Sequence, residues 1–522
     1  MGLYFNSVLT ELVIAVLTLL AVAYVYFTRN FRTWEKKGIP FLKPIPFFGN
    51  YKDLILVRKT TGVLLKDIYD KAADKPYIGV YAFDQPALVV RDTELIKKVL
   101  VKDFSAFVDR NFTPDKKLDP LAHRGLFSVS GQKWRQLRMK LTPTFTSGKM
   151  KRMFSLVDEC GKQLVTYVEK HTEDGVLEVK DAMARFTTDV ISTCAFGIEG
   201  DALTSDNSVF RAMLKRIFDL TYVRGLALMT AFFAPALASA LKLQFVDDLT
   251  MNWIRKTVWS TVEYREKNNV VRKDFLDMLM QIRSKGQVED DDNKEVSQKS
   301  SENFVFEGDD FVGQCFVFLT AGFETSSTTI TFALYELSFH SEIQTRAREE
   351  IQSVLQKYDG HLTYEGLQEM TYVGKVVSET LRKYPVLPFL DRKAVMPYTL
   401  PESNIQLEKG SVVLIPVMGI HYDSKFYPDP ERFDPERFSE ERKRARPNYT
   451  YLPFGEGPRN CIGDRMGLMQ SKVGLVHILA NYEVKSCQGT PFPIVFDPRN
   501  SLLGTKDGIP LRFTRIKQVP AA

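Results

Sequence analysis

Cysteine and histidine are scarce in this chain of 522 residues, which holds five cysteines and six histidines. The cysteines are far apart in the sequence, and neither a CxxC pair nor a secreted disulfide pattern occurs. We therefore expect the body of the protein to lie in a reducing compartment. The histidines form no ligand cluster. The net charge of +6 is small for this length, so we expect no nucleic-acid partner, although local basic patches can still bind an acidic protein.

Long apolar runs are also rare. Residues 8–27 form an apolar run whose only charge is Glu11, and its length suits a single membrane-spanning helix. A cleavable signal peptide is not indicated, because a basic start and a small-residue cleavage site are missing. The sequence therefore predicts a membrane anchor over residues 1–28. Four basic residues follow and, by the positive-inside rule, place the body on the cytoplasmic side: Arg29, Arg32, Lys36 and Lys37.

Composition divides the rest of the chain. Pro40, Pro44 and Pro46 stiffen the backbone after the basic residues, so we expect a basic, proline-rich hinge over residues 29–50. The remaining residues, 51–522, are predicted to form one domain.

Periodicity within that domain indicates a fold that is mainly α with smaller β-sheets, an α+β architecture. Short β-like runs at residues 77–81 and 87–90 precede a mostly helical region, which includes an apolar helix expected over residues 311–339. A charged linker is expected at residues 286–310. Toward the C-terminus, prolines, glycines and a run at residues 412–415 indicate loops and a small sheet.

One cysteine stands in a glycine-rich loop, Phe454-Gly-Glu-Gly457-Pro-Arg459-Asn-Cys461-Ile-Gly463. An apolar stretch with helical spacing follows, so the dipole and free N–H groups of a helix start would favour a thiolate at Cys461. Glycines let a backbone approach a flat ligand closely. The loop could present this thiolate to an iron, with Arg459 pairing a carboxylate of the same ligand. The alternative is a glycine turn before a packed helix, with Cys461 in the core.

The spacing Phe-x-x-Gly-x-Arg-x-Cys-x-Gly resembles the haem-binding signature of the cytochrome P-450 superfamily and matches it at every defined position. The resemblance covers nearly the whole chain, from the apolar N-terminus to residues 508–513. It implies the cytochrome P-450 fold with an N-terminal transmembrane anchor, and haem b as the cofactor. It also implies that Cys461 is the axial ligand of the haem iron, and that Phe454 and Arg459 contact the haem.

A second motif, Ala-Gly-Phe-Glu-Thr-Ser at residues 321–326, lies in the long apolar helix. Glu324 and Thr325 put an acid beside an alcohol, a pair that can relay protons to a bound oxygen species, and Gly322 is expected to expose backbone there. The alternative is a helix with a polar face whose hydroxyls, such as that of Thr329, bond to carbonyls. The motif resembles the superfamily's oxygen-activation motif, which implies Glu324 and Thr325 as catalytic residues.

Glu379 and Arg382 have the i,i+3 spacing that puts two side chains on one helix face. With the downstream Pro-Glu-Arg-Phe sequence they resemble the family's buried Glu-Arg-Arg network, which braces the cysteine loop. Arg432 and Arg437 both lie in such a sequence, and Arg437 is preferred because it is nearer the cysteine loop. A buried charge is tolerated only when it is paired, so this network is expected to be structural.

Three more residues are implied to bind the haem. Trp134 and Arg138 are one helical turn apart and resemble the family's Trp-x-x-x-Arg, which faces a haem propionate. Arg392, ten residues after Arg382, matches a third cation near the propionates. For each of these arginines the alternative is an ordinary surface residue.

The chemistry that the resemblance implies is monooxygenation of lipophilic substrates with O2 at a haem thiolate. Electrons are implied to come from NADPH through a separate flavoprotein, NADPH–cytochrome reductase, with cytochrome b5 as an additional donor. Two alternatives are a haem-thiolate isomerase or dehydratase, which needs no outside electrons, and a non-enzymatic haem carrier or gas sensor. The expected substrate pocket is lined by Phe107, Phe112, Leu118, Phe318, Leu387 and Leu502.

Both motifs, with Phe107-Val-Asp109-Arg110, look most like the insect detoxification families. This implies an enzyme of the endoplasmic reticulum membrane that acts on xenobiotics such as insecticides or plant toxins, or alternatively on endogenous lipids. An uncharged stretch at residues 225–241 matches a family segment that touches the membrane, and a buried hairpin is the alternative. Basic residues are expected to dock the acidic reductase: Lys133, Arg135, Lys140, Lys149, Lys151, Arg152, Arg442, Lys443, Arg444 and Arg446.

Overall fold

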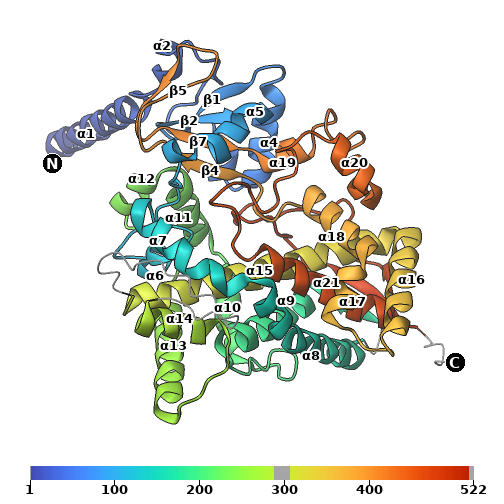
Figure 1. Ribbon diagram of the computed structural model, residues 1–522. Helices are drawn as coiled ribbons and strands as arrows, with labels where there is room; N and C mark the ends of the chain where they lie inside the picture. Colours follow the sequence, from blue (N-terminus) through green and yellow to red (C-terminus); the bar gives the residue numbers. More distant parts are fainter. Residues whose placement is uncertain (1, 173–174, 287–305, 517–522) are drawn as a thin grey trace.

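A long central helix organises the body of the protein. α15 (Asp309–Phe339) agrees with the apolar helix expected from the sequence, and most of its side chains are buried. It crosses the middle of the molecule beside α21 (Asp464–Asn481) (Figure 1). It also packs against α6 (Pro120–Arg124), α9 (Val179–Ile191) and α18 (Thr371–Lys383). Segments from the whole length of the chain therefore meet along one helix.

The computed structural model describes residues 2–172, 175–286 and 306–516. The expected linker over residues 286–310 lies largely outside these described residues. Further helices surround the centre: α4 (Thr61–Lys71), α7 (Gly131–Leu141), α8 (Ser147–His171), α10 (Val209–Phe218), α13 (Asp248–Asn268), α14 (Phe275–Lys285), α16 (Ser341–Lys357), α17 (Tyr364–Glu369), α19 (Val417–His421) and α20 (Glu440–Ala445).

Small sheets complete the fold and confirm the α+β prediction. The largest has the order β1-β2-β7-β4, with β2 and β7 parallel and the outer pairs antiparallel. A second has the order β3-β9-β8, and β5 pairs with β6. The strands are β1 (Tyr77–Ala82), β2 (Gln85–Val90), β3 (Val176–Glu178), β4 (Leu390–Lys393), β5 (Tyr398–Thr399), β6 (Gln406–Leu407), β7 (Val412–Ile415), β8 (Tyr482–Ser486) and β9 (Pro510–Arg515).

The segment expected as a hinge, residues 29–50, is fastened to β1. Trp34 is buried, and its indole Nε1 donates to the carbonyl of Val80 over 3.0 Å. A Cβ at Gly79 would come within 2.5 Å of the Trp34 ring, so glycine is needed for this close packing. Arg29 pairs with Asp84 at 2.9 Å. The apolar N-terminal helix therefore joins the body through a packed segment.

α1 (Gly2–Thr28) projects from the body beside the β-rich part (Figure 1). Among the described residues, one helical stretch is long and apolar enough to cross a membrane, Val8–Lys36, with a mean hydropathy of 2.4 in its most apolar window. None of that window is buried against the protein. This agrees with the expected membrane anchor.

The second apolar stretch, residues 225–241, is largely buried as far as residue 234, whereas Leu241 at its end is exposed. It forms α11 (Tyr222–Phe233) and α12 (Pro235–Ala240). Phe232 and Phe233 are 6% and 5% exposed and pack with Phe389 at ring distances of 5.4 and 5.3 Å. These two phenylalanines therefore belong to the core, as the buried-hairpin alternative requires, and cannot form a membrane-facing patch.

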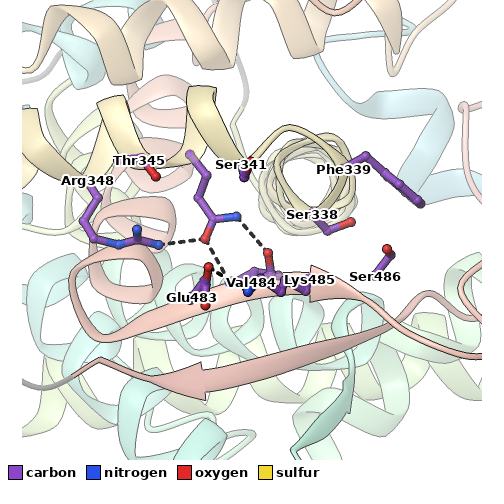
Figure 2. A pocket seen from close by; sticks show the side chains of 10 residues that line it. Ser338, Phe339, Ser341, Thr345, Arg348, Glu483, Val484, Lys485 and Ser486 are labelled. Carbon is purple, nitrogen blue, oxygen red and sulfur yellow. Dashed lines mark hydrogen bonds and ion pairs between the residues drawn. The ribbon is translucent and has the colours of Figure 1, made fainter.

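A polar recess lies between the end of α15, α16 and β8 (Figure 2). The Gln344 side chain donates to the Val484 carbonyl over 2.8 Å and accepts from the Val484 N–H over 2.9 Å. Arg348 donates to the same amide oxygen over 2.7 Å. The residues that line the recess include none of the cysteine loop or of the 321–326 motif, so the recess lies apart from both. Its hydrogen bonds join α16 to β8.

Candidate active site around Cys461

The cysteine loop is held in a fixed shape by its own backbone. The N–H of Cys461 donates to the carbonyl of Phe454 over 2.8 Å, and the N–H of Gly455 donates to the carbonyl of Leu452 over 3.1 Å. Gly457 has φ +76°, and a Cβ there would come within 2.0 Å of the Leu100 carbonyl oxygen. Glycine is therefore required at this position. The loop ends where α21 begins, with Gly463 as the N-cap residue.

Cys461 differs from the other four cysteines in its surroundings. All five thiols are free, but Cys461 is exposed, whereas Cys160, Cys194 and Cys315 are buried and Cys487 is half-buried. Although Cys461 is partly open to solvent, the protein around its thiol desolvates it, and this raises its pKa above the ordinary value. The Gly463 N–H and the charges of Arg138 and Arg110 act in the opposite direction. A thiolate here needs a further positive partner, as a metal ligand would have.

A cluster of buried arginines lies beside the loop. Burial, followed by repulsion from Arg110, lowers the pKa of both Arg392 and Arg459 to about 9. Two carboxylates lie among them: Asp391, 3.3 Å from Arg110, and Asp109, 3.6 Å from Arg459. The Nε atoms of all three arginines are buried without a hydrogen-bond partner. This excess of buried positive charge fits a ligand with carboxylates, which haem has in its propionates.

Trp134 and Arg138 connect α7 to this cluster. Arg138 donates to the carbonyl and the side-chain oxygen of Asn460, over 2.9 and 2.7 Å. Trp134 is buried, and the Arg459 guanidinium lies over its ring, 4.7 Å from the centroid. Arg459 also donates to the carbonyls of Val108 and Val129. The structure thus brings the α7 residues and the cysteine loop together.

Sequence reasoning missed two members of this cluster. Arg110 was noted only as part of a family likeness, yet its guanidinium is buried over the Phe127 ring, at 4.1 Å. Asp391 accepts from Arg110 and from the N–H groups of Asn111 and Phe112. The only signal in the sequence is position: Arg110 ends the Phe107–Arg110 motif, and Asp391 directly precedes Arg392. Pairing them needed the contact between the chain near residue 110 and β4.

Thr325 and Ala321 lie on one face of α15, because they are four residues apart. Ala321 is exposed and Thr325 half-buried, and the Thr325 hydroxyl donates to the Ala321 carbonyl over 2.6 Å. Thr329 similarly donates to the Thr325 carbonyl over 2.8 Å. α21 follows the cysteine loop and packs along this part of α15: a Cβ at Gly467 would lie 3.9 Å from Ser326, and Gln470 donates to the Gly322 carbonyl over 3.2 Å. The cysteine loop therefore ends beside the 321–326 motif.

Glu324 and Gly322 face other neighbours. Glu324 is buried, and burial raises the pKa of its carboxyl despite the charges of Lys180 and Arg211. At Gly322 a Cβ would come within 2.7 Å of the Ile191 side chain. The expectation that Gly322 exposes backbone where a side chain would otherwise stand is therefore corrected: that space is taken by Ile191 of α9. Glu324 and Thr325 are adjacent in sequence but point to different surroundings.

Glu379, Arg382 and Arg437 meet behind the loop. Arg382 and Glu379 form two hydrogen bonds of 2.7 and 2.8 Å, and both side chains are 0% exposed. Arg437 lies 3.4 Å from Glu379, whereas Arg432 is exposed. Burial opposes the charge of Arg382, but its hydrogen bonds with Glu379 raise its pKa, so the guanidinium stays charged. The geometry is that of a buried charge network.

The expected pocket residues separate into two groups. Phe112 packs on Phe232 of α11, and Leu118 lies beside Gln244, whose side chain donates to its carbonyl. Leu387 and Leu502 lie in two segments that are hydrogen-bonded to each other. For example, the Leu503 N–H donates to the Val386 carbonyl over 2.8 Å. By contrast, Phe107 is fully buried against Tyr398 in the core of the β-rich part.

Phe318 packs on Phe145 and Phe275, at ring distances of 5.3 and 4.0 Å. It lies two turns before Thr325 on the same face of α15, so it stays a predicted pocket residue. We therefore remove only Phe107 from the substrate-facing set.

Comparison with known proteins agrees with this architecture. The cytochrome P-450 family model matches residues 39–512. Relatives include cytochromes P-450 6j1 and 6k1 of Blattella germanica, 46% and 45% identical over 512 residues, which cover 98% and 97% of this chain and 99% and 97% of their own. Cytochrome P-450 6a2 of Drosophila melanogaster is 42% identical over 521 residues, 98% of this chain and 100% of its own. The resemblance to insect families is thus confirmed. The chain belongs to the cytochrome P-450 family and is an oxidoreductase of its monooxygenase class.

Proposed function

We propose that the protein oxygenates lipophilic small molecules, taking electrons from NADPH through a flavoprotein reductase. The observation that carries this proposal is the meeting of an accessible Cys461 thiol, a buried arginine cluster and the Thr325 face of α15. Cys461 would hold the haem iron, and Arg110, Arg138, Arg392 and Arg459 would hold the propionates. When bound, haem supplies O2 activation, which a thiolate ligand favours. The α15 face and the apolar residues around Phe112 position the substrate and limit water.

Reconstitution separates this function from its alternatives. Purified protein, reductase, NADPH and a lipophilic test compound should yield an oxygenated product only when all four are present. An isomerase or dehydratase would convert its substrate without NADPH, and a carrier or sensor would bind haem without any turnover. Incorporation of one labelled oxygen atom from O2 into the product is the decisive measurement.

Replacement of Thr325 with alanine should uncouple electron use from product formation. The Oγ1 of Thr325 donates to the Ala321 carbonyl and keeps its lone pairs for a donor in the site. To pass a proton into the site, the hydroxyl would turn its own hydrogen away from the Ala321 carbonyl while a donor supplies a proton to its lone pair. Positioned proton transfer typically contributes 10²–10⁴-fold, and because water can replace part of it, we expect product per NADPH to fall by about tenfold. The electrons should leave as hydrogen peroxide or water.

Thr329→Ala is the matched control for this experiment. Its hydroxyl makes the same kind of bond, to the Thr325 carbonyl, but the side chain is buried. Thr329→Ala should keep the wild-type ratio of product to NADPH. An unchanged ratio in Thr325→Ala would remove Thr325 from the proton path.

The reductase should dock on the side of the molecule that carries α7. Several residues of the expected basic set are already paired: Lys133 with Asp310, Lys151 with Glu365 and Arg442 with Asp434. Arg135 is exposed on α7, next to Trp134. Since surface charge pairs contribute up to about 1 kcal/mol, Arg135→Glu should raise the reductase concentration at half-maximal rate by about fivefold.

A peroxide-driven reaction, which bypasses the reductase, provides the internal control for Arg135→Glu. Its rate should not change, and neither should the reductase dependence of Lys409→Glu, an exposed charge reversal beyond β6. Equal losses in the reductase-driven and peroxide-driven reactions would instead indicate damage to the haem site.

The proposed location is the endoplasmic reticulum membrane, with α1 as a single span and the body in the cytoplasm. Basic residues after α1 support this orientation. Cytochrome b5 is proposed as an additional electron donor. Xenobiotics are proposed as the substrate class because the motifs resemble those of the insect detoxification families, with endogenous lipids as the second candidate.

A further inference from the structure

We propose that His421 is a positioning residue, which fixes the start of the cysteine loop against Arg382 and thereby sets the place of the Cys461 thiolate. This inference rests on the proposed role of Cys461 as the haem ligand. His421 ends α19 and is 0% exposed. It lies in neither of the two sequence motifs that identify the haem site.

Both ring nitrogens of His421 are used. Nδ1 lies 3.0 Å from the Arg382 carbonyl oxygen, and Nε2 lies 2.9 Å from the backbone N of Leu452. In return, Arg382 Nη1 donates to the His421 carbonyl over 2.9 Å. The imidazole therefore joins the buried Glu379–Arg382 pair to the backbone of a distant segment.

Backbone hydrogen bonds within the loop connect Leu452 to Cys461. The Leu452 carbonyl accepts from the Gly455 N–H over 3.1 Å, and the carbonyl of Phe454, two residues after Leu452, accepts from the Cys461 N–H over 2.8 Å. A displacement of Leu452 would move the carbonyl that holds Cys461. Buried hydrogen bonds of this kind hold a site within the small tolerance that catalysis requires.

The contacts also determine the tautomer. Leu452 N–H is a donor, so Nε2 must be unprotonated, and Nδ1 must carry the hydrogen for the Arg382 carbonyl. Burial, followed by the charges of Arg382 and Arg446, lowers the pKa of His421 to about 3. The ring stacks on Tyr451 at 5.6 Å and meets the edge of Tyr427 at 6.2 Å. The imidazole stays neutral, so the link to Leu452 persists at physiological pH.

Two substitutions at His421 test its two side-chain hydrogen bonds separately. His421→Asn places an amide N–H near the former Nδ1 and can keep the bond to Arg382, but it removes the acceptor for Leu452. His421→Gln can place its amide oxygen near the former Nε2 and keep that acceptor. Each variant loses about one hydrogen bond, so their thermal unfolding midpoints should be similar.

The two variants should differ at the loop. Hydrogen exchange of the Leu452 amide should be about tenfold faster in His421→Asn than in His421→Gln, because its buried N–H has lost its partner. The ferrous carbon monoxide complex of His421→Asn should lose its red-shifted, thiolate-type Soret band about tenfold faster on warming. His421→Gln should keep the wild-type band.

Each result bears on the proposal. Failure of His421→Asn to take up haem, when His421→Gln takes it up, would support it. Equal loss of the band in both variants, failure of both to take up haem, or unchanged Leu452 exchange in His421→Asn would overturn it. If wild-type protein itself lacks the thiolate-type band, the proposed role of Cys461 fails, whereas the Leu452 exchange comparison still tests the link.

Discussion

Replacing Cys461 with serine should abolish the red-shifted Soret band of the ferrous carbon monoxide complex and reduce monooxygenation by at least about 10³-fold. The thiolate donates electron density that a serine hydroxyl cannot supply, so the chemical step loses its main assistance. The loop itself should survive, because Cys461 is held through its backbone N–H to Phe454. The substitution thus removes the ligand atom and leaves the frame around it.

The measurements for Cys461→Ser are the absorption spectrum, the haem content and the rate with reductase and NADPH. Cys487→Ser is the matched control: this half-buried thiol contacts Thr490 and Pro510 near the C-terminal sheet. It should keep both the band and the rate. A thiolate-type band that persists in Cys461→Ser would show that another residue holds the iron.

Glu379→Gln should cost about 3–5 kcal/mol of stability and most of the bound haem. The carboxylate accepts two hydrogen bonds from Arg382 and one from the Asp434 N–H, at 3.0 Å, and lies 3.4 Å from Arg437. Its loss leaves two arginine charges without their partner, one of them fully buried. Breaking a buried pair from one side is costly because the remaining charge stays desolvated.

Denaturant midpoints and haem content of the purified protein measure this effect. Glu440→Gln is the control with the same i,i+3 spacing, because Glu440 pairs with Lys443 at 3.0 Å on an exposed helix. It should change neither quantity measurably. If Glu379→Gln were as stable as Glu440→Gln, the network could not be what braces the cysteine loop.

Local sequence predicted the elements that carry the chemistry. The long apolar helix, the strands near residues 77–90 and 412–415, and the membrane-length N-terminal helix all follow from periodicity and run length. The glycines of the cysteine loop are another local signal, since positive φ and the approach of Leu100 leave no room for a side chain at Gly457. The motif match extended these signals to a family.

Errors arose where the partner of a residue comes from elsewhere in the chain. The apolar stretch at residues 225–241 suggested a membrane contact, but distant aromatic residues such as Phe389 bury its Phe232 and Phe233. Gly322 suggested an open backbone, but Ile191 of α9 fills the space. Apolar composition alone does not say whether lipid or protein covers a side chain.

By itself, the sequence determined the class of this protein: a mainly helical body behind an apolar N-terminal helix, with one cysteine in a haem-binding signature. Only the tertiary structure decided which cations surround that cysteine, which neighbours meet each face of α15, and how His421 joins Arg382 to the loop. The physical reason is the distance along the sequence between the residues that interact. Helix periodicity and glycine turns depend on neighbouring residues, whereas burial and charge pairing depend on segments that meet only after the chain has folded.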